Sequence, residues 1–519
     1  MVTKHLVGRG SFTRGGCAAG ALAAGMALTA CSGVSRVSEP LAAGGQATSM
    51  VVEGPIAMGK GGARAVTAGG EGGGAAAHSV ANVGSGGVGG IGGTDVPGSD
   101  VGGTSAAYAG HGFVVHEWGT DTIVVGSDGS LQRGLHHEEE DLPAFVYDRI
   151  KEGTLLGAQF SPAVTIKMET PVTYFYSDQP LTARAQVAFP QGVLTQWYPG
   201  VTNFSPPIAA PDSVMDQVPL VYADPVLDVN FPYRIEQCRK DVSAIAGGLL
   251  DWGTFSVLPR GTDIAKDQPA APLEKFGWSY ARAVDSNPLR MQNGEAERFL
   301  FYRGLGDFDL PVSVHALGAG QVTVQNLNSE PLAQVFVLNV DGTSGAFSQH
   351  PAGVAAGSTL SAVAPDLEQG QPLDVYAEQL GVAVTAALDT SGLFHDEAVA
   401  MVNTWKRQWF RTPGTRILFL MPQSWTDRSI PLTIDPKPED LRRVMLIRVE
   451  VITPEQERAD VSAVALFGSD PVAAKAHFAA LGRFAEPRLR RALALDQDAT
   501  GAAYLATIRT ANSSVANGE

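Results

Sequence analysis

The sequence contains little cysteine: Cys17, Cys31 and Cys238 are the three in 519 residues. Cys17 lies within a segment typical of an export signal, and Cys31 lies at its end. Cys238 is therefore the one cysteine expected in the folded part. This count excludes a disulfide framework within the mature chain, so stability must come from a hydrophobic core.

Aromatic and charged residues are scarce between residues 41 and 110. This segment has one aromatic residue, Tyr108, and six charged residues, but it holds 22 of the 60 glycines. Its apolar surface is too small to offset the entropy of ordering the backbone. We predict a disordered Gly/Ala-rich tether over residues 31–110 and a folded part over residues 111–519.

Positive charge is deficient in the folded part. Residues 111–519 contain 31 Lys and Arg against 48 Asp and Glu, a net charge of −17. Such a surface repels phosphate backbones. The charge balance therefore excludes nucleic acid as an expected partner.

No apolar run near the N-terminus is long enough to cross a membrane. Lys4, Arg9 and Arg14 precede the small apolar residues 15–30. At 1.5 Å per residue that stretch covers about 24 Å, less than the roughly 30 Å hydrocarbon core. This order of charge and apolar residues predicts a signal peptide over residues 1–30.

The end of this segment, Leu28-Thr29-Ala30-Cys31, resembles the lipobox of bacterial lipoproteins. The resemblance implies cleavage before Cys31, acylation of that residue and anchoring to a membrane. Ser32 in the second mature position implies the outer membrane. The alternative is an ordinary secretory signal followed by a chance cysteine.

The folded part begins with period-two apolar runs. Between residues 113 and 365 they are separated by Gly, Pro, Asn and Asp. This pattern predicts a β-rich, sandwich-like antiparallel domain over residues 111–365.

The pattern changes after Pro365. Residues 372–388 and 393–411 have helical periodicity, with Ser391 as the expected N-cap of the second helix. Strands are expected at 417–421 and 444–452, and helices near 470–484 and 486–496, the last opened by Pro487. The fold class is thus α+β, with a smaller α+β domain over residues 366–519.

Imidazole and carboxylate groups are concentrated at the start of the β-rich part. Four of the ten histidines lie between residues 111 and 137. These groups bind divalent metal ions, and zinc is the ion we expect if a metal binds here. The candidate metal ligands are Asp121, His136, His137, His116 and Glu138, with Glu139 as the candidate general base for a metal-bound water.

A hairpin would bring two of these ligands together. With a turn at residues 126–130, Asp121 lies across from His136, whereas His116 lies about 16 Å away along the strand. The alternative is that residues 136–141 form a solvated charged run before a helix. No H-E-x-x-H, C-x-x-C pair or calcium loop accompanies the cluster.

Two weaker candidates lie further along the chain. Arg303 and Asp307 flank a double-glycine loop, where they could form an ion pair or bind a ligand carboxylate. Ser279 lies in an incomplete nucleophile motif, G-W-S-Y-A, whose last position does not match. Aromatic residues near 174–176 and 197–198 are interpreted first as packing residues and second as a carbohydrate or peptide groove.

Three strings resemble those of a family of exported bacterial proteins to which no activity is assigned: V-H-E-W-G-T at 115–120, L-H-H-E-E-E at 135–140 and K-M-E-T-P-V at 167–172. The likeness continues through F-Y-R-G-L-G at 301–306 and the helix containing Trp405. It spans most of residues 111–490 and implies one recurring unit, without an assigned reaction or cofactor.

These observations indicate a lipid-anchored cell-envelope protein. We expect a non-catalytic binding or structural module whose partner is an envelope protein or polysaccharide. The alternative is a divalent-metal-dependent hydrolase with its site near residues 116–141.

Overall fold

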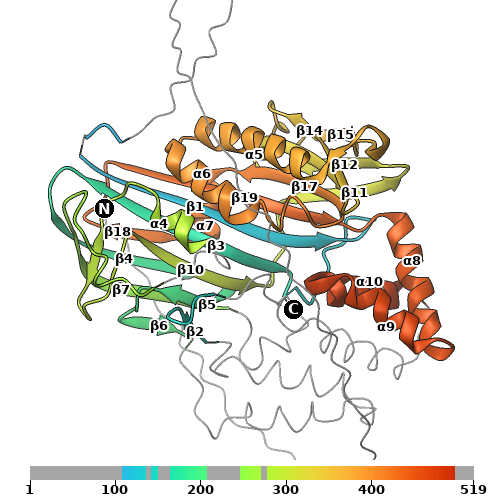
Figure 1. Ribbon diagram of the computed structural model, residues 1–519, viewed down its shortest axis with the longest axis horizontal. Coiled ribbons are helices and arrows are strands. Elements are labelled where there is room, and N and C mark those ends of the chain that lie inside the picture. The colour runs from blue at the N-terminus through green and yellow to red at the C-terminus, as the bar shows by residue number, and fades with distance from the viewer. Residues whose placement is uncertain are drawn as a thin grey trace, which may run out of the picture. The chain divides into compact units, whose positions relative to one another are not determined.

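A computed structural model describes residues 108–110, 112–135, 142–149, 164–206, 246–270 and 277–496. In this part of the chain large, mainly antiparallel sheets are combined with a smaller number of helices (Figure 1). The predicted β-rich α+β class is confirmed.

The largest sheet has ten strands, and β1 lies near its centre. Its strands, in spatial order, are β16 (Gln371–Pro372), β14 (Ser344–His350), β13 (Ala333–Val340), β17 (Gly414–Met421), β19 (Asp440–Val451), β1 (Phe113–Val125), β3 (Ile166–Ser177), β10 (Phe299–Gly306), β5 (Gly192–Tyr198) and β2 (Tyr147–Asp148). β1 and β19 are parallel, and the other neighbours in this sheet are antiparallel.

Strands from both predicted domains contribute to this sheet. β17 and β19 come from the C-terminal part of the chain, yet they lie between β13 and β1. The ten-stranded sheet therefore contains strands from both sides of the predicted domain boundary near residue 365. The periodicity of the sequence gave no sign of this arrangement, because it reports local structure and not which distant strands pair.

Two smaller sheets lie against the first one. One contains β18 (Leu432–Asp435), β4 (Leu181–Phe189), β7 (Gly248–Val257), β8 (Leu289–Met291) and β9 (Ala296–Glu297), with β6 (Asn203–Ser205) paired to β7; the other contains β11 (Val312–Gly318), β12 (Gln321–Asn326) and β15 (Thr359–Val363). Alternate apolar residues of all three sheets form the larger hydrophobic core between them.

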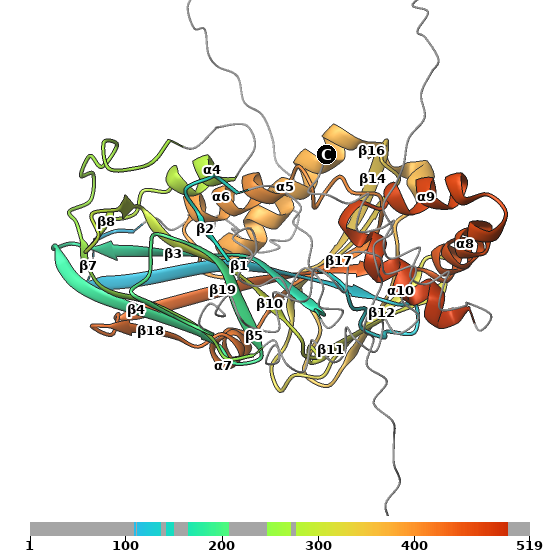
Figure 2. The ribbon, with the colours of Figure 1, turned by 90° about the horizontal axis from the view of Figure 1, so that it is seen from below.

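Helices cover the opposite face of the ten-stranded sheet. They are α4 (Trp278–Arg282), α5 (Leu373–Thr390) and α6 (His395–Trp405), which enclose a second core with the sheet (Figure 2). The predicted helices near 372–388 and 393–411 are confirmed as α5 and α6. Ser391, however, ends α5, and Phe394 is the N-cap residue of α6, whose backbone N–H is bound by Glu397.

The chain continues through α7 (Gln423–Ser429) and ends, in its described part, with three helices. These are α8 (Pro454–Ala465), α9 (Pro471–Ala479) and α10 (Ala485–Leu495), grouped at one end of the large sheet around a small core of their own (Figures 1 and 2). None of the helices in the described ranges has the length and apolar character needed to cross a membrane.

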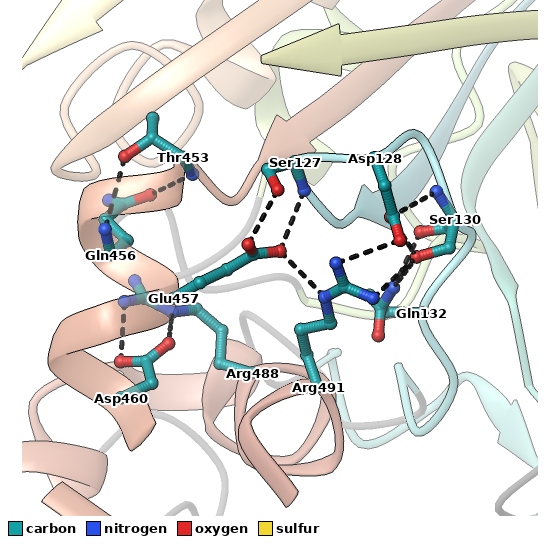
Figure 3. A network of polar contacts seen from close by, with 10 residues as sticks. All are labelled: Ser127, Asp128, Ser130, Gln132, Thr453, Gln456, Glu457, Asp460, Arg488 and Arg491. Carbon is teal, nitrogen blue, oxygen red and sulfur yellow. Dashed lines mark hydrogen bonds and ion pairs between the residues drawn. The ribbon is translucent and has the colours of Figure 1, made fainter. Parts of the chain in front are cut away.

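A polar network joins these terminal helices to the turn after β1 (Figure 3). Glu457 of α8 accepts hydrogen bonds from the backbone N–H of Ser127, at 2.9 Å, and from its hydroxyl, at 2.6 Å. Arg491 of α10 donates to the same Glu457 carboxylate at 2.7 Å and lies 3.0 Å from Asp128. The network therefore ties the helical end of the molecule to the central strand.

Candidate functional site

Successive side chains of the V-H-E-W-G-T string lie on opposite faces of β1. His116 and Trp118 face the helices, where they meet α6 and the second core. Glu117 faces the smaller sheets together with Tyr302 and Arg443. This alternation follows from the pleat of a strand that is buried on both sides.

His116 links β1 to α6. Its Nδ1 lies 2.8 Å from Oε2 of Glu397, and the other oxygen of that carboxylate accepts the Tyr176 hydroxyl at 2.7 Å. All three side chains are buried, and the ring of Phe394 packs against the imidazole at 4.3 Å. Burial, with the charge of Glu397, raises the pKa of Tyr176 well above its ordinary value. In this arrangement both oxygens of Glu397 are occupied by protein groups.

Glu117 belongs to a second buried cluster. Arg443 of β19 donates to its Oε1 at 2.8 and 2.6 Å, while Tyr302 and Thr173 donate to its Oε2 at 2.8 and 2.9 Å. Burial alone would lower the pKa of Arg443, but the charge and hydrogen bonds of Glu117, together with Tyr302 and Asp427, outweigh burial and raise this pKa. Protein donors therefore bind both oxygens of the Glu117 carboxylate.

Asp121 lies in the larger hydrophobic core. It is paired with Met168 of β3 and Ile447 of β19, and directly paired residues face the same side of a sheet. Burial, with the nearby charge of Glu169, raises the pKa of Asp121 to about 8. Its Oδ1 has no hydrogen-bond partner within the described structure. This carboxyl group is therefore largely protonated at neutral pH.

The structure does not bring His116 and Asp121 together. They lie on opposite faces of β1, five positions apart, so they cannot share one ion. The described residues contain no group of three or more His, Cys, Asp or Glu side chains that could hold a metal. His136, His137, Glu138 and Glu139 lie outside the described residues, as does Cys31, and the predictions made for them remain predictions.

The predicted turn after β1 is present, but the hairpin is short. Gly126 N–H donates to the Ser130 carbonyl at 2.8 Å, and Val125 bridges to Leu131. Further back along β1 both edges are occupied, one by β3 and the other by β19. Asp121 therefore has no free strand edge for the expected pairing with His136.

A pocket opens on the helical face of the sheet, beside Trp118. Its floor comes from β1, β3 and β10, and its walls come from α4 and α6. The enclosed cavity is small, about 30 Å³, and a wider open mouth brings the empty space to about 440 Å³. The lining consists of Trp118, Leu142, Thr170, Val172, Gly277, Trp278, Ala281, Phe299, Phe301, Arg303, Thr404 and Trp405. The lining thus combines five aromatic residues with one arginine and two threonines.

Hydrogen bonds fix two of the pocket's indole rings. Trp405 of α6 donates from Nε1 to the Thr170 hydroxyl at 3.2 Å. Trp278 of α4 donates from Nε1 to Glu297 at 3.1 Å, and the same buried carboxylate pairs with Arg282 at 2.7 Å. The aromatic walls are therefore held in place before any ligand arrives.

Arg303 is the cationic residue of this lining. Its Nε donates to the Glu169 carbonyl at 2.6 Å, and its guanidinium lies 5.8 Å from the centre of the Phe301 ring. Asp307, predicted as its partner, lies 3.5 Å from Arg133 instead. The structure thus puts Arg303 in the pocket and directs Asp307 to a different arginine.

Other predicted residues have packing roles. Trp197 lies in the larger core and Tyr198 in the second one, as the packing interpretation expected. Ser279 lies on the short helix α4 between two aromatic residues. Sequence reasoning missed the pocket because Trp118, Trp278 and Trp405 are far apart in the chain. One sequence signal pointed to the pocket. Alternate residues of a strand face the same side, so Phe299, Phe301 and Arg303 of β10 lie on one face of the sheet.

No family model matches this chain, and comparison with curated proteins finds no similar sequence.

Proposed function

We propose that this protein is a lipid-anchored cell-envelope protein whose folded part is a non-catalytic binding module. The ligand group we propose is small and apolar and ends in a carboxylate. The observation that carries the proposal is the pocket, whose lining combines five aromatic residues with Arg303. Its ligand would belong to an envelope protein, a polysaccharide substituent or a small metabolite.

The chemistry of the lining supports binding over catalysis. Aromatic rings bury apolar surface, which stabilises a complex by roughly 25 cal/mol per Å². The guanidinium of Arg303 donates its Nε–H to the Glu169 carbonyl and has further interactions, so a ligand carboxylate would compete for its remaining N–H groups. The hydroxyls of Thr170 and Thr404 add polar contacts without supplying a general base.

The anchor rests on the sequence. The lipobox at residues 28–31 predicts an acylated Cys31, and the tether would let the binding module reach on the order of 50 Å from the membrane. Mass spectrometry of the N-terminal peptide from membrane extracts checks this part. Acylated Cys31 is the expected result, and a soluble chain that begins elsewhere contradicts the anchor.

Titration with phenylacetate and with phenylacetamide tests the pocket, because the two ligands differ only in the carboxylate. Three tryptophans line the pocket, so binding changes the intrinsic fluorescence of the purified full chain. We expect phenylacetate to bind at least about tenfold more tightly, since a hydrogen bond to a charged group contributes about 1.5–3 kcal/mol. Equal affinities, or no binding of either compound, would contradict the proposal.

Two variants locate the binding. Arg303→Met keeps an apolar stem and removes the charge, so it should abolish the preference for the acid. Arg133→Met removes a half-exposed arginine outside the lining and should leave the preference unchanged. Thermal unfolding of both variants shows whether they keep the fold. The comparison of phenylacetate with phenylacetamide tests the proposal on the parent chain even if a variant does not fold.

A further inference from the structure

The three-stranded sheet ends on an edge strand that is suited to pairing. β15 pairs with β12 on one side and forms the edge of its sheet on the other. Its side chains alternate: Thr359, Ser361 and Val363 are exposed, whereas Leu360 and Ala362 pack against the larger core. Val363 is 61% exposed, although it is a large apolar residue.

This edge has none of the usual protection against strand pairing. Natural edge strands carry charges, proline or bulges, or they are covered by another element. β15 is T-L-S-A-V, and no Asp, Glu, Lys or Arg occurs between Asp341 and Asp366. In a chain with a net charge of −16, the strand itself therefore adds no like-charge repulsion to a pair with a second copy.

Several other sheet edges in the described part are short, carry a charge or a proline, or are covered. β2, β9 and β16 have two residues each, and they contain Asp148, Glu297 and Pro372 respectively. β18 has four residues, lies between two prolines and ends in Asp435. The free side of β11 is covered, since Ala316 N–H donates to the carbonyl of Ser127 at 3.0 Å. β15 has none of these features; among the described strands, β6 and the part of β14 beyond Gly345 also lack a strand partner on one side.

We infer that β15 pairs with β15 of a second copy of this chain. In an antiparallel pair centred on Ser361, Thr359 lies opposite Val363 and Leu360 lies opposite Ala362. Each pair then faces the same side in both copies, so the exposed and core-facing rows continue across the seam. Asp366 lies opposite Ala356, which keeps the acidic residues that follow the strand away from one another.

A second copy fits this edge better than an unrelated peptide does. The pairing is self-complementary in register, side-chain face and charge, and a twofold contact of this kind closes on itself. It joins two three-stranded sheets into one and satisfies the backbone groups of both edges. The product is a dimer, not a filament.

Cysteine cross-linking of the full chain tests the register. In Ser361→Cys the two sulfurs lie opposite each other, where Cα atoms of antiparallel pairs are about 4.5–5.5 Å apart, within disulfide reach. In Thr359→Cys the two copies of the new cysteine are four positions apart, roughly 13 Å, which is beyond reach. After mild oxidation we expect a covalent dimer for Ser361→Cys only, above the level of the parent chain.

The remaining outcomes overturn the inference. Equal cross-linking of both variants indicates random collision, and none above the parent indicates that this edge is unpaired. A covalent product with a different protein identifies another partner. As a check without cysteine, Ser361→Lys puts two like charges at the seam, so sedimentation should show a dimer for the parent chain and a monomer for the variant.

Discussion

The carboxylate of Glu117 lies 2.6 Å from the guanidinium of Arg443, where β1 pairs with β19. In chain order these are the first and the last strand of the large sheet. Both side chains are almost fully buried. The two residues are directly opposite in the parallel pair of β1 and β19, so the ion pair helps to fix the register between strands far apart in the chain. Breaking it leaves the buried guanidinium of Arg443 with a weaker ion pair, to the 46% exposed side chain of Asp427 at 3.1 Å.

Glu117→Gln should therefore be strongly destabilising. We expect a loss of about 3–5 kcal/mol in the free energy of unfolding, because Arg443 stays buried and charged. Urea unfolding followed by tryptophan fluorescence measures the loss. Glu378→Gln is the matched control: it breaks an exposed ion pair with Lys406 and should cost at most about 1 kcal/mol. Similar losses in the two variants would refute this account of the Glu117 cluster.

The buried Asp121 predicts stability that decreases as the pH rises. Its pKa is about 8 in the folded chain against 3.8 for an ordinary aspartate, so the folded state binds more protons between these values. The contribution of Asp121 to the free energy of unfolding is therefore complete below about pH 4 and is lost as the pH rises to about 8. Each pKa unit corresponds to about 1.4 kcal/mol.

Asp121→Asn removes this titration. Urea unfolding at a series of pH values from 5 to 9 should show a flatter dependence in Asp121→Asn than in the parent chain. Glu368→Gln, at an exposed acidic residue, should leave the slope unchanged. A parent chain whose stability does not fall across this range would contradict a protonated, buried Asp121.

Glu450 predicts the opposite behaviour in acid. Burial alone would raise its pKa, but Arg416 and Arg448 outweigh burial and lower the pKa to about 2, below the ordinary 4.5. Its contribution is therefore complete above pH 4.5 and is lost as the pH falls toward 2. Glu450→Gln should cost about 3 kcal/mol at neutral pH and lose less stability than the parent on acidification. Unfolding curves at pH 7 and pH 3 decide this, and an equal acid loss in both chains would contradict it.

Local features of the fold were predictable from the sequence. The turn at residues 126–130 follows from Gly and Asp at positions that favour turns, and its closing hydrogen bond is present. The apolar stripe containing Met401 and Trp405 predicted a helix, and in α6 both residues lie on the buried face. The Ser391 cap failed because the sequence does not show that α5 extends to Thr390 and that Ser391 closes it.

Features that depend on distant pairing were not predictable. β1 is buried on both faces and on both edges, so alternation in its sequence does not distinguish ligands exposed in a site from groups inside a core. Asp121 was expected beside His136, whereas its neighbours across the strands are Met168 and Ile447. The pocket has the same origin: its five rings come from four separate segments, and their convergence depends on the order of the strands.

The network around Glu457 makes a prediction about local, not global, stability. Its carboxylate accepts hydrogen bonds from the Ser127 backbone, the Ser127 hydroxyl and Arg491, and it is the direct link between α8 and the turn after β1 (Figure 3). Hydrogen bonds to a charged group contribute about 1.5–3 kcal/mol, or roughly a ten- to hundredfold change in an opening equilibrium.

In Glu457→Gln we expect hydrogen exchange to become faster by that factor in α8 and α10, while amides of β1 and β3 keep the protection they have in the parent chain. The helices have a small core of their own, so we expect them to open from the turn while the sheet stays folded; Phe484, which packs with Val124 of β1, should limit the opening near the start of α10. Arg458→Ala is the control, because its side chain is 69% exposed and pairs only within α8. Unchanged exchange in α8 and α10, or an equal increase throughout the sheet, would show that Glu457 does not act as a local clamp.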